Sequence, residues 1–238
     1  MSDVKLPVIQ HPLFVIKDHG GKSWSFRPML VREEKLLLMA RESGEMSDIL
    51  LAIRQIVGNC AVDSSYSVDK LPLFELEHAF LKIRGFSVGN EINVAYKDGE
   101  DEKVYNFKIN LDKVSTRVPE VEKKVGINAT SGFILRHPPA SLYGNKSYAS
   151  AKDSDAFFKL VASCIDVVYD GDKVFEARDF TEEDLLEFID RLDVRSFERV
   201  RNFMLNLPSL YYKLEYKNAL GHDRMIELTT LSDFFTLQ

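Results

Sequence analysis

The segment closest to a chemical motif is Gly21-Lys22-Ser23, because a phosphate-binding loop ends in Gly-Lys-Ser or Gly-Lys-Thr. The glycine that opens such a loop would fall at position 16, which is Ile16. The helix that would hold the phosphates is replaced by Trp-Ser-Phe-Arg-Pro at 24–28. The spacing therefore favours a hairpin turn over a nucleotide site.

Histidine and cysteine are the side chains from which many metal sites are built. No histidine falls two to four residues from another histidine or a cysteine, so no local ligand pair can form. The five histidines are His11, His19, His78, His137 and His222. Cys60 and Cys164 fall on apolar faces of predicted helices, where a thiol packs as a small hydrophobe. We expect no metal, no other cofactor and no catalytic residue.

Acid-base catalysis needs two ionisable groups held apart in an apolar cleft. The acidic run at 182–184 instead opens a predicted helix, where it complements the helix dipole. The densest basic cluster consists of Arg191, Arg195, Arg199 and Arg201, and acidic residues are interspersed with it, as is typical of a solvated face of ion pairs.

Two alternatives stay open at this point. One is an enzyme whose site is assembled from residues distant in sequence, around His78, His137 or His222. The other is a nucleic-acid-binding module that uses the face carrying Arg191 and Arg201. A deep pocket with two titratable groups would favour the first, and salt-sensitive DNA binding would favour the second.

The chain has 238 residues, of which 45% are hydrophobic and 29% charged, a composition typical of a soluble globular protein. Two cysteines are too few for a secreted disulfide scaffold, which favours a reducing cytoplasm. No segment approaches the roughly 18 apolar residues of a membrane-spanning helix, and no signal peptide is evident. The net charge of -6 opposes non-specific attraction to nucleic acid. We expect neither membranes nor nucleic acid among the partners.

Hydrophobic periodicity predicts the order of elements in an N-terminal unit, residues 1–112. Alternating residues predict a hairpin with strands at 14–16 and 24–26. Helical spacing then predicts three successive helices, at 29–43, 47–60 with Ser47 as N-cap, and 72–85 with Gly85 as the stop. A second hairpin is expected at 92–96 and 104–111.

Residues 113–150 show little periodicity, and we expect a linker or partner-facing loop there, apart from a strand near 133–136. Residues 151–238 are expected to form a helical unit that ends in a hairpin at 211–216 and 225–228. Its predicted helices lie at 157–165, at 181–192 and at 196–207 with Ser196 as N-cap. The predicted fold class is α+β, with helices packed on small antiparallel hairpins in two pseudo-related halves.

Residues 26–40, with the sequence FRPMLVREEKLLLMA, resemble the baseplate hub assembly proteins of T-even-type tailed phages. The similarity continues through 56–60, 71–77 and 80–89, and it returns in Ser-Asp-Phe-Phe at 232–235. Some members of that family carry a Cys-x-x-Cys pair in each of two hairpins. The corresponding segments, 97–100 and 216–221, contain no cysteine in this sequence, so the resemblance implies no metal role here.

The resemblance implies a non-enzymatic protein that helps to build the baseplate hub during tail assembly. Its location would be the cytoplasm of the infected cell, with the virion baseplate as a second location. The implied partners are other hub proteins, with the tape-measure protein as a further candidate. Aromatic and arginine side chains often anchor protein interfaces. The residues that we predict to contact partners are Arg27, Arg32, Tyr143, Tyr148, Phe234 and Phe235.

Overall fold

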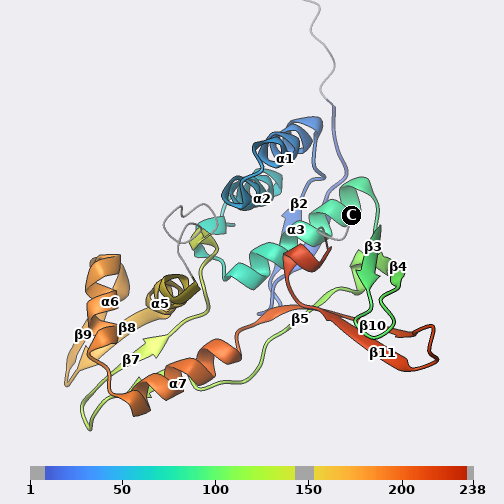
Figure 1. The fold of residues 1–238 in the computed structure, drawn as a ribbon. Helices are drawn as coiled ribbons and strands as arrows, with labels where there is room; N and C mark the ends of the chain where they lie inside the picture. Colours follow the sequence, from blue (N-terminus) through green and yellow to red (C-terminus); the bar gives the residue numbers. More distant parts are fainter. Residues whose placement is uncertain (1–8, 143–152, 235–238) are drawn as a thin grey trace, which may run out of the picture.

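The computed structural model describes residues 9–142 and 153–234 (Figure 1). In these two ranges six α-helices are combined with four small antiparallel sheets, which confirms the predicted α+β class. None of the helices in the described ranges has the length and apolar character needed to cross a membrane.

Residues 14–110 form a hairpin, three helices and a second hairpin, in the predicted order. The elements are β1 (Phe14–Lys17), β2 (Ser23–Phe26), α1 (Val31–Ser43), α2 (Met46–Cys60), α3 (Leu73–Val88), β3 (Glu91–Lys97) and β4 (Val104–Asn110). In the second hairpin Glu91 lies opposite Asn110, and Lys97 lies opposite Val104. In this part of the chain, the segments with strong hydrophobic periodicity therefore form the predicted helices and strands.

The boundaries of α2 and α3 differ from the sequence prediction in ways that have a structural reason. Helix α3 continues past Gly85 to Val88, and the residue with positive φ is Gly89, at 138°. Gly85 lies inside the helix in close contact with neighbouring residues, since an added Cβ would lie 2.8 Å from Oδ1 of Asn90 and would force that side chain to shift. Helix α2 begins after Glu45 rather than Ser47, and no side chain caps it. The glycine thus serves close packing rather than helix termination.

The segment expected to be a linker contains strands as well as loops. The strands are β5 (Ser115–Arg117), β6 (Lys124–Gly126) and β7 (Ser131–Leu135). Strand β5 pairs with β10 (Ser209–Lys217), which also pairs with β11 (Asp223–Leu228). Strands β6 and β7 join β8 (Ile165–Asp170) and β9 (Lys173–Glu176) in a sheet of order β6-β7-β8-β9. Strand β7 corresponds to the strand predicted near 133–136, whereas β5 and β6, with three residues each, are too short to show a clear period of two.

Three further helices cover this four-stranded sheet: α5 (Asp153–Cys164), α6 (Glu182–Asp190) and α7 (Val194–Leu205). Helix α6 begins with a capping box, in which Thr181 and Asp184 are bonded reciprocally. Helix α7 begins differently from the prediction. Asp193 is its N-cap, and the Asp193 carboxylate accepts hydrogen bonds from the backbone N–H and the hydroxyl of Ser196, each at 2.9 Å.

Two hydrophobic cores organise the chain, and they group its residues differently from the division at 113–150. The first core contains α2, α3 and β3, together with Leu210, Leu228 and Phe234 from the end of the chain. The second contains Val125 and Phe133 together with α5 and α7. The end of the chain returns to the first core because β10 pairs with β5, and this pairing buries Leu210.

A small aromatic contact joins α3 to α7. The ring of His137 lies 5.8 Å from that of Phe74 in α3 and 6.0 Å from that of Phe203 in α7. Beside it, the backbone N–H of Leu73 donates to the carbonyl of Pro138 at 2.7 Å. Figure 1 shows α1, α2 and α3 on one side of this junction and α5, α6 and α7 on the other.

Candidate protein interaction site

The two arginines of the 26–40 motif meet at one carboxylate. Glu33 is fully buried, and Arg27 donates to its two oxygens, with Nη2–Oε1 at 2.9 Å and Nη1–Oε2 at 3.1 Å. Nε of Arg32 donates to Oε1 at 2.8 Å, and the backbone N–H of Leu30 donates to Oε2 at 2.9 Å. The motif therefore builds a buried ionic centre at the start of α1.

This centre fixes the protonation state of Glu33 and the position of α1. Burial raises the pKa of Glu33, but the hydrogen bonds from Arg27, Leu30 and Arg32 outweigh it and lower that pKa to about 2. Nη1 of Arg27 also donates to the carbonyl of Pro28 and lies 3.7 Å from Sγ of Cys60. The guanidinium group of Arg27 is bonded to groups within the fold, so it is not available to a partner. The side chain of Arg32, in contrast, is 67% exposed.

The other predicted contact residues have different locations. Phe234 is 2% exposed and packs in the first core, so its ring is used internally. Tyr143, Tyr148 and Phe235 lie outside the described residues.

Helix α1 exposes several of its large apolar side chains. Only Glu33 and Ala40 of this helix are buried, whereas Val31, Leu38 and Met39 are each at least 50% exposed. Exposed apolar groups on one element indicate a surface that another protein can cover.

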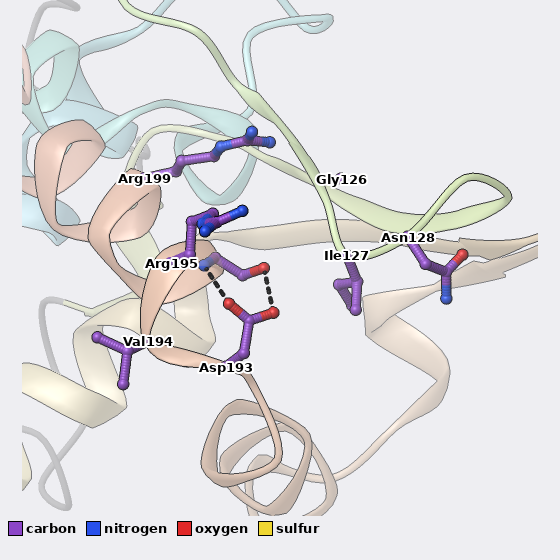
Figure 2. A pocket seen from close by; sticks show the side chains of 8 residues that line it. Gly126, Ile127, Asn128, Asp193, Val194, Arg195 and Arg199 are labelled. Carbon is purple, nitrogen blue, oxygen red and sulfur yellow. Dashed lines mark hydrogen bonds between the residues drawn. The ribbon is translucent and has the colours of Figure 1, made fainter.

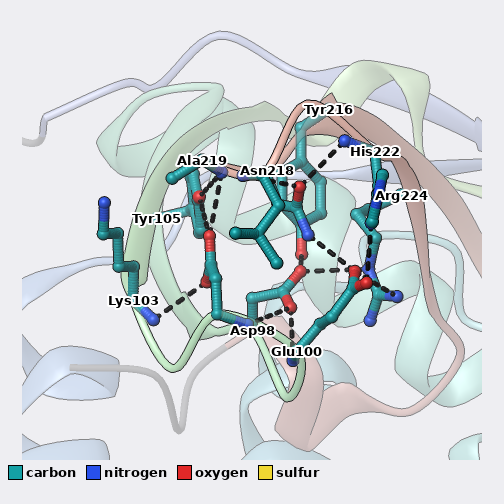
Figure 3. Close-up of polar contacts among 11 residues, drawn as sticks. Asp98, Glu100, Lys103, Tyr105, Tyr216, Asn218, Ala219, His222 and Arg224 are labelled. Atoms are coloured by element: carbon teal, nitrogen blue, oxygen red, sulfur yellow. Dashed lines mark hydrogen bonds and ion pairs between the residues drawn. The ribbon is translucent and has the colours of Figure 1, made fainter.

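The tips of two hairpins distant in sequence pack together through a polar network (Figure 3). Asp98, in the turn after β3, is buried, and its carboxylate accepts hydrogen bonds from the Tyr216 hydroxyl and, at 3.1 Å, from Nε of Arg224. The Tyr216 hydrogen bond, together with the Arg224 charge, outweighs burial and lowers the pKa of Asp98. Burial first, and then the bond to Asp98, raise the pKa of Tyr216 to about 12.

Glu100 provides a second set of contacts between the same hairpins. Its carboxylate lies 2.7 Å from Nδ2 of Asn218, 2.6 Å from Nδ1 of His222 and 3.3 Å from Nη1 of Arg224. These hairpins are the ones that correspond to the Cys-x-x-Cys hairpins of the similar proteins. In the part of the chain that the structure describes, no group of three or more His, Cys, Asp or Glu residues could hold a metal ion. Charge-assisted hydrogen bonds therefore join the hairpins here.

An open groove of about 670 Å³ lies between the β6–β7 hairpin and the start of α7 (Figure 2). Its lining residues are Gly126, Ile127, Asn128, Asp193, Val194, Arg195, Ser196 and Arg199. The side chains of Arg195 and Arg199 extend from α7 towards the β6 side of the groove. The lining thus combines two positive charges with one carboxylate, which is already bonded to Ser196.

The arginines of this helix region differ in their partners. Arg191 is paired with Glu187, and Arg201 is paired with Glu198 at 3.4 Å. Arg195 and Arg199 form no ion pair within 4.0 Å with any residue in the described ranges, although the charge of Arg195 helps to lower the pKa of Asp193. The prediction of a solvated face of ion pairs is therefore confirmed for Arg191 and Arg201 but not for Arg195 and Arg199.

A family model described as T4 bacteriophage base plate protein matches residues 12–236. The chain belongs to this family. Searches of curated proteins and of solved structures found no match. The resemblance drawn from the 26–40 motif is thus supported at the level of a T4-type phage baseplate protein, associated with the virion or with its assembly and interacting with other baseplate proteins.

The surroundings of His78 and His137, two of the histidines considered for an enzyme, leave little space for a substrate in this baseplate protein. The cavity beside His78, which Glu75 and Tyr66 also line, holds about 20 Å³, space for about one water molecule. Burial lowers the pKa of His78 to about 4 and raises that of Glu75. Burial also lowers the pKa of His137, which lies between two aromatic rings, to about 4.

The sequence analysis of the baseplate protein placed Arg195 and Arg199 in the basic cluster but did not distinguish them from Arg191 and Arg201, although one signal was present. Arg199 has no acidic residue three or four positions away, where a helical ion pair would form. Arg195 has Glu198 at that spacing, but Glu198 pairs with Arg201 instead. Choosing between two arginines for one glutamate requires the structure.

Proposed function

We propose that this chain is an assembly factor or component of the baseplate hub that acts through non-covalent contacts with other hub proteins during tail morphogenesis. The tape-measure protein is a further candidate partner. Family membership over residues 12–236 supports the baseplate role, and the residues of the 26–40 motif support the narrower assignment to the hub.

The single observation that carries the proposal is the use of that motif in the structure. Arg27 and Arg32 of the motif are both bonded to its Glu33, which anchors the start of the helix. The apolar residues Val31, Leu38 and Met39 of the same helix remain exposed. A helix that is anchored by a buried ionic centre and exposes apolar side chains among its charged ones suits binding to another polypeptide, because no segment has to be ordered when the partner binds.

The proposal is tested by expressing the chain together with each hub protein of its phage, and with the tape-measure protein. Size-exclusion chromatography with mass measurement then reports complexes of defined composition. We expect co-elution with at least one hub protein. Elution as a lone monomer in every pairing would overturn the proposal.

A pair of matched variants locates the contact. Replacing Leu38 and Met39 together by Gln removes exposed apolar area without adding charge, and we expect weaker co-elution. Replacing the exposed Glu34 and Glu42 of the same helix by Gln is the control. Equal retention of the partner by both variants would show that this side of α1 is not the contact.

A further inference from the structure

The groove between β6 and α7 presents two arginines in a fixed arrangement. Arg195 and Arg199 are four residues apart on one helix, so they lie on the same face with a rise of about 6 Å between them. An added Cβ at Gly126 would lie 3.9 Å from Nη1 of Arg199, which places that guanidinium group over the end of β6. The floor of the groove next to Arg199 is therefore backbone rather than side chain.

The rise between these two helix positions matches one backbone conformation of a bound chain. Alternate residues of an extended strand lie about 6.6 Å apart on the same side, close to the rise between the two arginines. Arginine binds carboxylates through two parallel hydrogen bonds, which adds orientation as well as energy. Two carboxylates two residues apart in an extended segment would thus each face one guanidinium group.

The edge of β6 offers backbone groups to such a segment. Strand β6 pairs only with β7 in the described sheet. The backbone N–H of Ile127 donates to the carbonyl of Ser131, and the N–H of Leu135 donates to that of Lys123. Because hydrogen-bonded pairs alternate in an antiparallel ladder, the backbone groups of Gly126 face away from β7. An extended segment can hydrogen-bond to them as an added strand.

The other residues of the lining argue for a protein ligand. Ile127 and the exposed Val194 provide apolar contacts, and the lining contains no aromatic side chain on which a base could stack. The acidic hairpin tip of a second copy is a poor ligand, because Asp98 and Glu100 are bonded to Tyr216, Asn218 and Arg224. A net charge of -6 also disfavours nucleic acid.

We propose that the groove of Arg195, Arg199 and the β6 edge binds an extended acidic segment of another baseplate protein, with Asp or Glu at alternate positions. This inference rests on the proposed function, since it specifies the chemistry of a partner. The arginines hold the carboxylates, and the edge of β6 holds the backbone of the segment.

The first test measures binding of a fluorescein-labelled eight-residue peptide in which Glu alternates with Thr, by fluorescence anisotropy with the full chain. The matched control is the same peptide with Gln in place of Glu. We expect the Glu peptide to bind at least about tenfold more tightly, since two charge-assisted pairs are lost in the control. Equal binding of the two peptides would overturn the proposal.

Variants of the chain locate the binding to the groove. The double variant Arg195→Gln, Arg199→Gln should weaken binding of the Glu peptide about tenfold or more. The control Arg191→Gln, Arg201→Gln removes the same charge from arginines that are already paired, and it should bind as the natural chain does. An equal loss in both variants would show a general charge effect and would contradict the proposal.

A third variant blocks the groove without removing an arginine. Gly126→Asp places a carboxylate beside Nη1 of Arg199, and the space there accepts a Cβ at ordinary contact distance. We expect the new carboxylate to pair with Arg199 in place of a peptide carboxylate, and so to weaken binding of the Glu peptide. Tighter binding of a 20-base-pair DNA duplex than of the Glu peptide, with the same dependence on Arg195 and Arg199, would assign the groove to nucleic acid and overturn the proposal.

Co-expression with the hub proteins separates the two proposals. Loss of the hub partner by the Arg195/Arg199 double variant, with retention by the Arg191/Arg201 control, supports both. Retention of the partner by the double variant leaves the hub function standing and overturns the groove proposal. Failure of the natural chain to bind any hub protein or the tape-measure protein overturns the function, and with it this inference.

Discussion

Two pairs of arginines in this baseplate protein have opposite roles. Arg27 and Arg32 converge on the buried carboxylate of Glu33, where Arg27 contributes two hydrogen bonds and Arg32 one. Arg195 and Arg199 stand on a helix at the edge of an open groove, without an ion pair among the residues that the structure describes. The first pair stabilises the fold, and the second is available to a ligand.

The difference shows that the residues packed around an arginine decide whether it can bind a ligand. Its position in a sequence motif does not decide this. The 26–40 motif made Arg27 a predicted contact, but its carboxylate partner lies six residues along the chain and closes a buried ionic centre. The 191–201 cluster was expected to be paired throughout, but it contains fewer suitably placed carboxylates than arginines.

The largest effect is expected from Glu33→Ala, which leaves Arg27 buried without its partner. Removing one member of a buried ion pair typically destabilises a protein by about 3–5 kcal/mol, because the remaining charge is uncompensated. Urea denaturation followed by circular dichroism measures the change. The neighbouring Glu34 is exposed, and Glu34→Ala should change the free energy of unfolding by less than about 0.5 kcal/mol. Similar losses in both variants would contradict an internal role for the first arginine pair.

The pH dependence of stability tests the same centre. The pKa of Glu33 is lowered from 4.5 to about 2, so its contribution is fully present above pH 4.5 and is lost as the pH falls towards 2. We expect the stability difference between the natural chain and Glu33→Gln to be constant above pH 4.5 and to narrow below it, by up to about 3 kcal/mol. Denaturant unfolding at pH 7, 4 and 3 measures it, and a difference that does not change with pH would refute the assignment.

The parts of the fold that could be predicted from the sequence are those with long periodic patterns. The first hairpin, the three helices after it and the second hairpin all follow local alternation or helical spacing. Strands β5 and β6 could not be found in this way, because each has three residues and is defined by a partner elsewhere in the chain. The return of Leu210 to the first core depends on the pairing of β5 with β10, which no local pattern encodes.

The candidate site was less predictable than the fold, for a related reason. The groove exists because the β6–β7 hairpin lies beside the start of α7, about 70 residues further along the chain. The sequence shows that Arg195 and Arg199 share a helical face, but not that Gly126 lies against it. The hairpin junction is similar, since Asp98 gains its buried bonds from Tyr216 and Arg224 of a distant hairpin.

Arg224, at the junction of the two hairpins, is a third arginine whose partners lie within the chain, since it is bonded to Asp98 and Glu100. Tyr216→Phe removes the hydroxyl hydrogen bond to the buried carboxylate of Asp98 without changing the shape of the ring. We expect the Tm to fall by about 2–4 °C, as is usual for one such bond in a chain of this size. Tyr212→Phe is the control, because the Tyr212 ring packs against the first core. Equal Tm values for the two variants would show that the junction adds no stability.

The smallest effect on stability is expected for the double variant of Arg195 and Arg199, which should have a large effect on binding of the Glu peptide. Arg195→Gln, Arg199→Gln removes two side chains without an ion pair in the described ranges and relieves repulsion between like charges four residues apart. The free energy of unfolding should therefore stay within about 0.5 kcal/mol of that of the natural chain, or rise by a few tenths. Urea denaturation measures it beside Glu33→Ala. A loss of 2 kcal/mol or more would mean that the second pair supports the fold as the first pair does, and the contrast between them would fail.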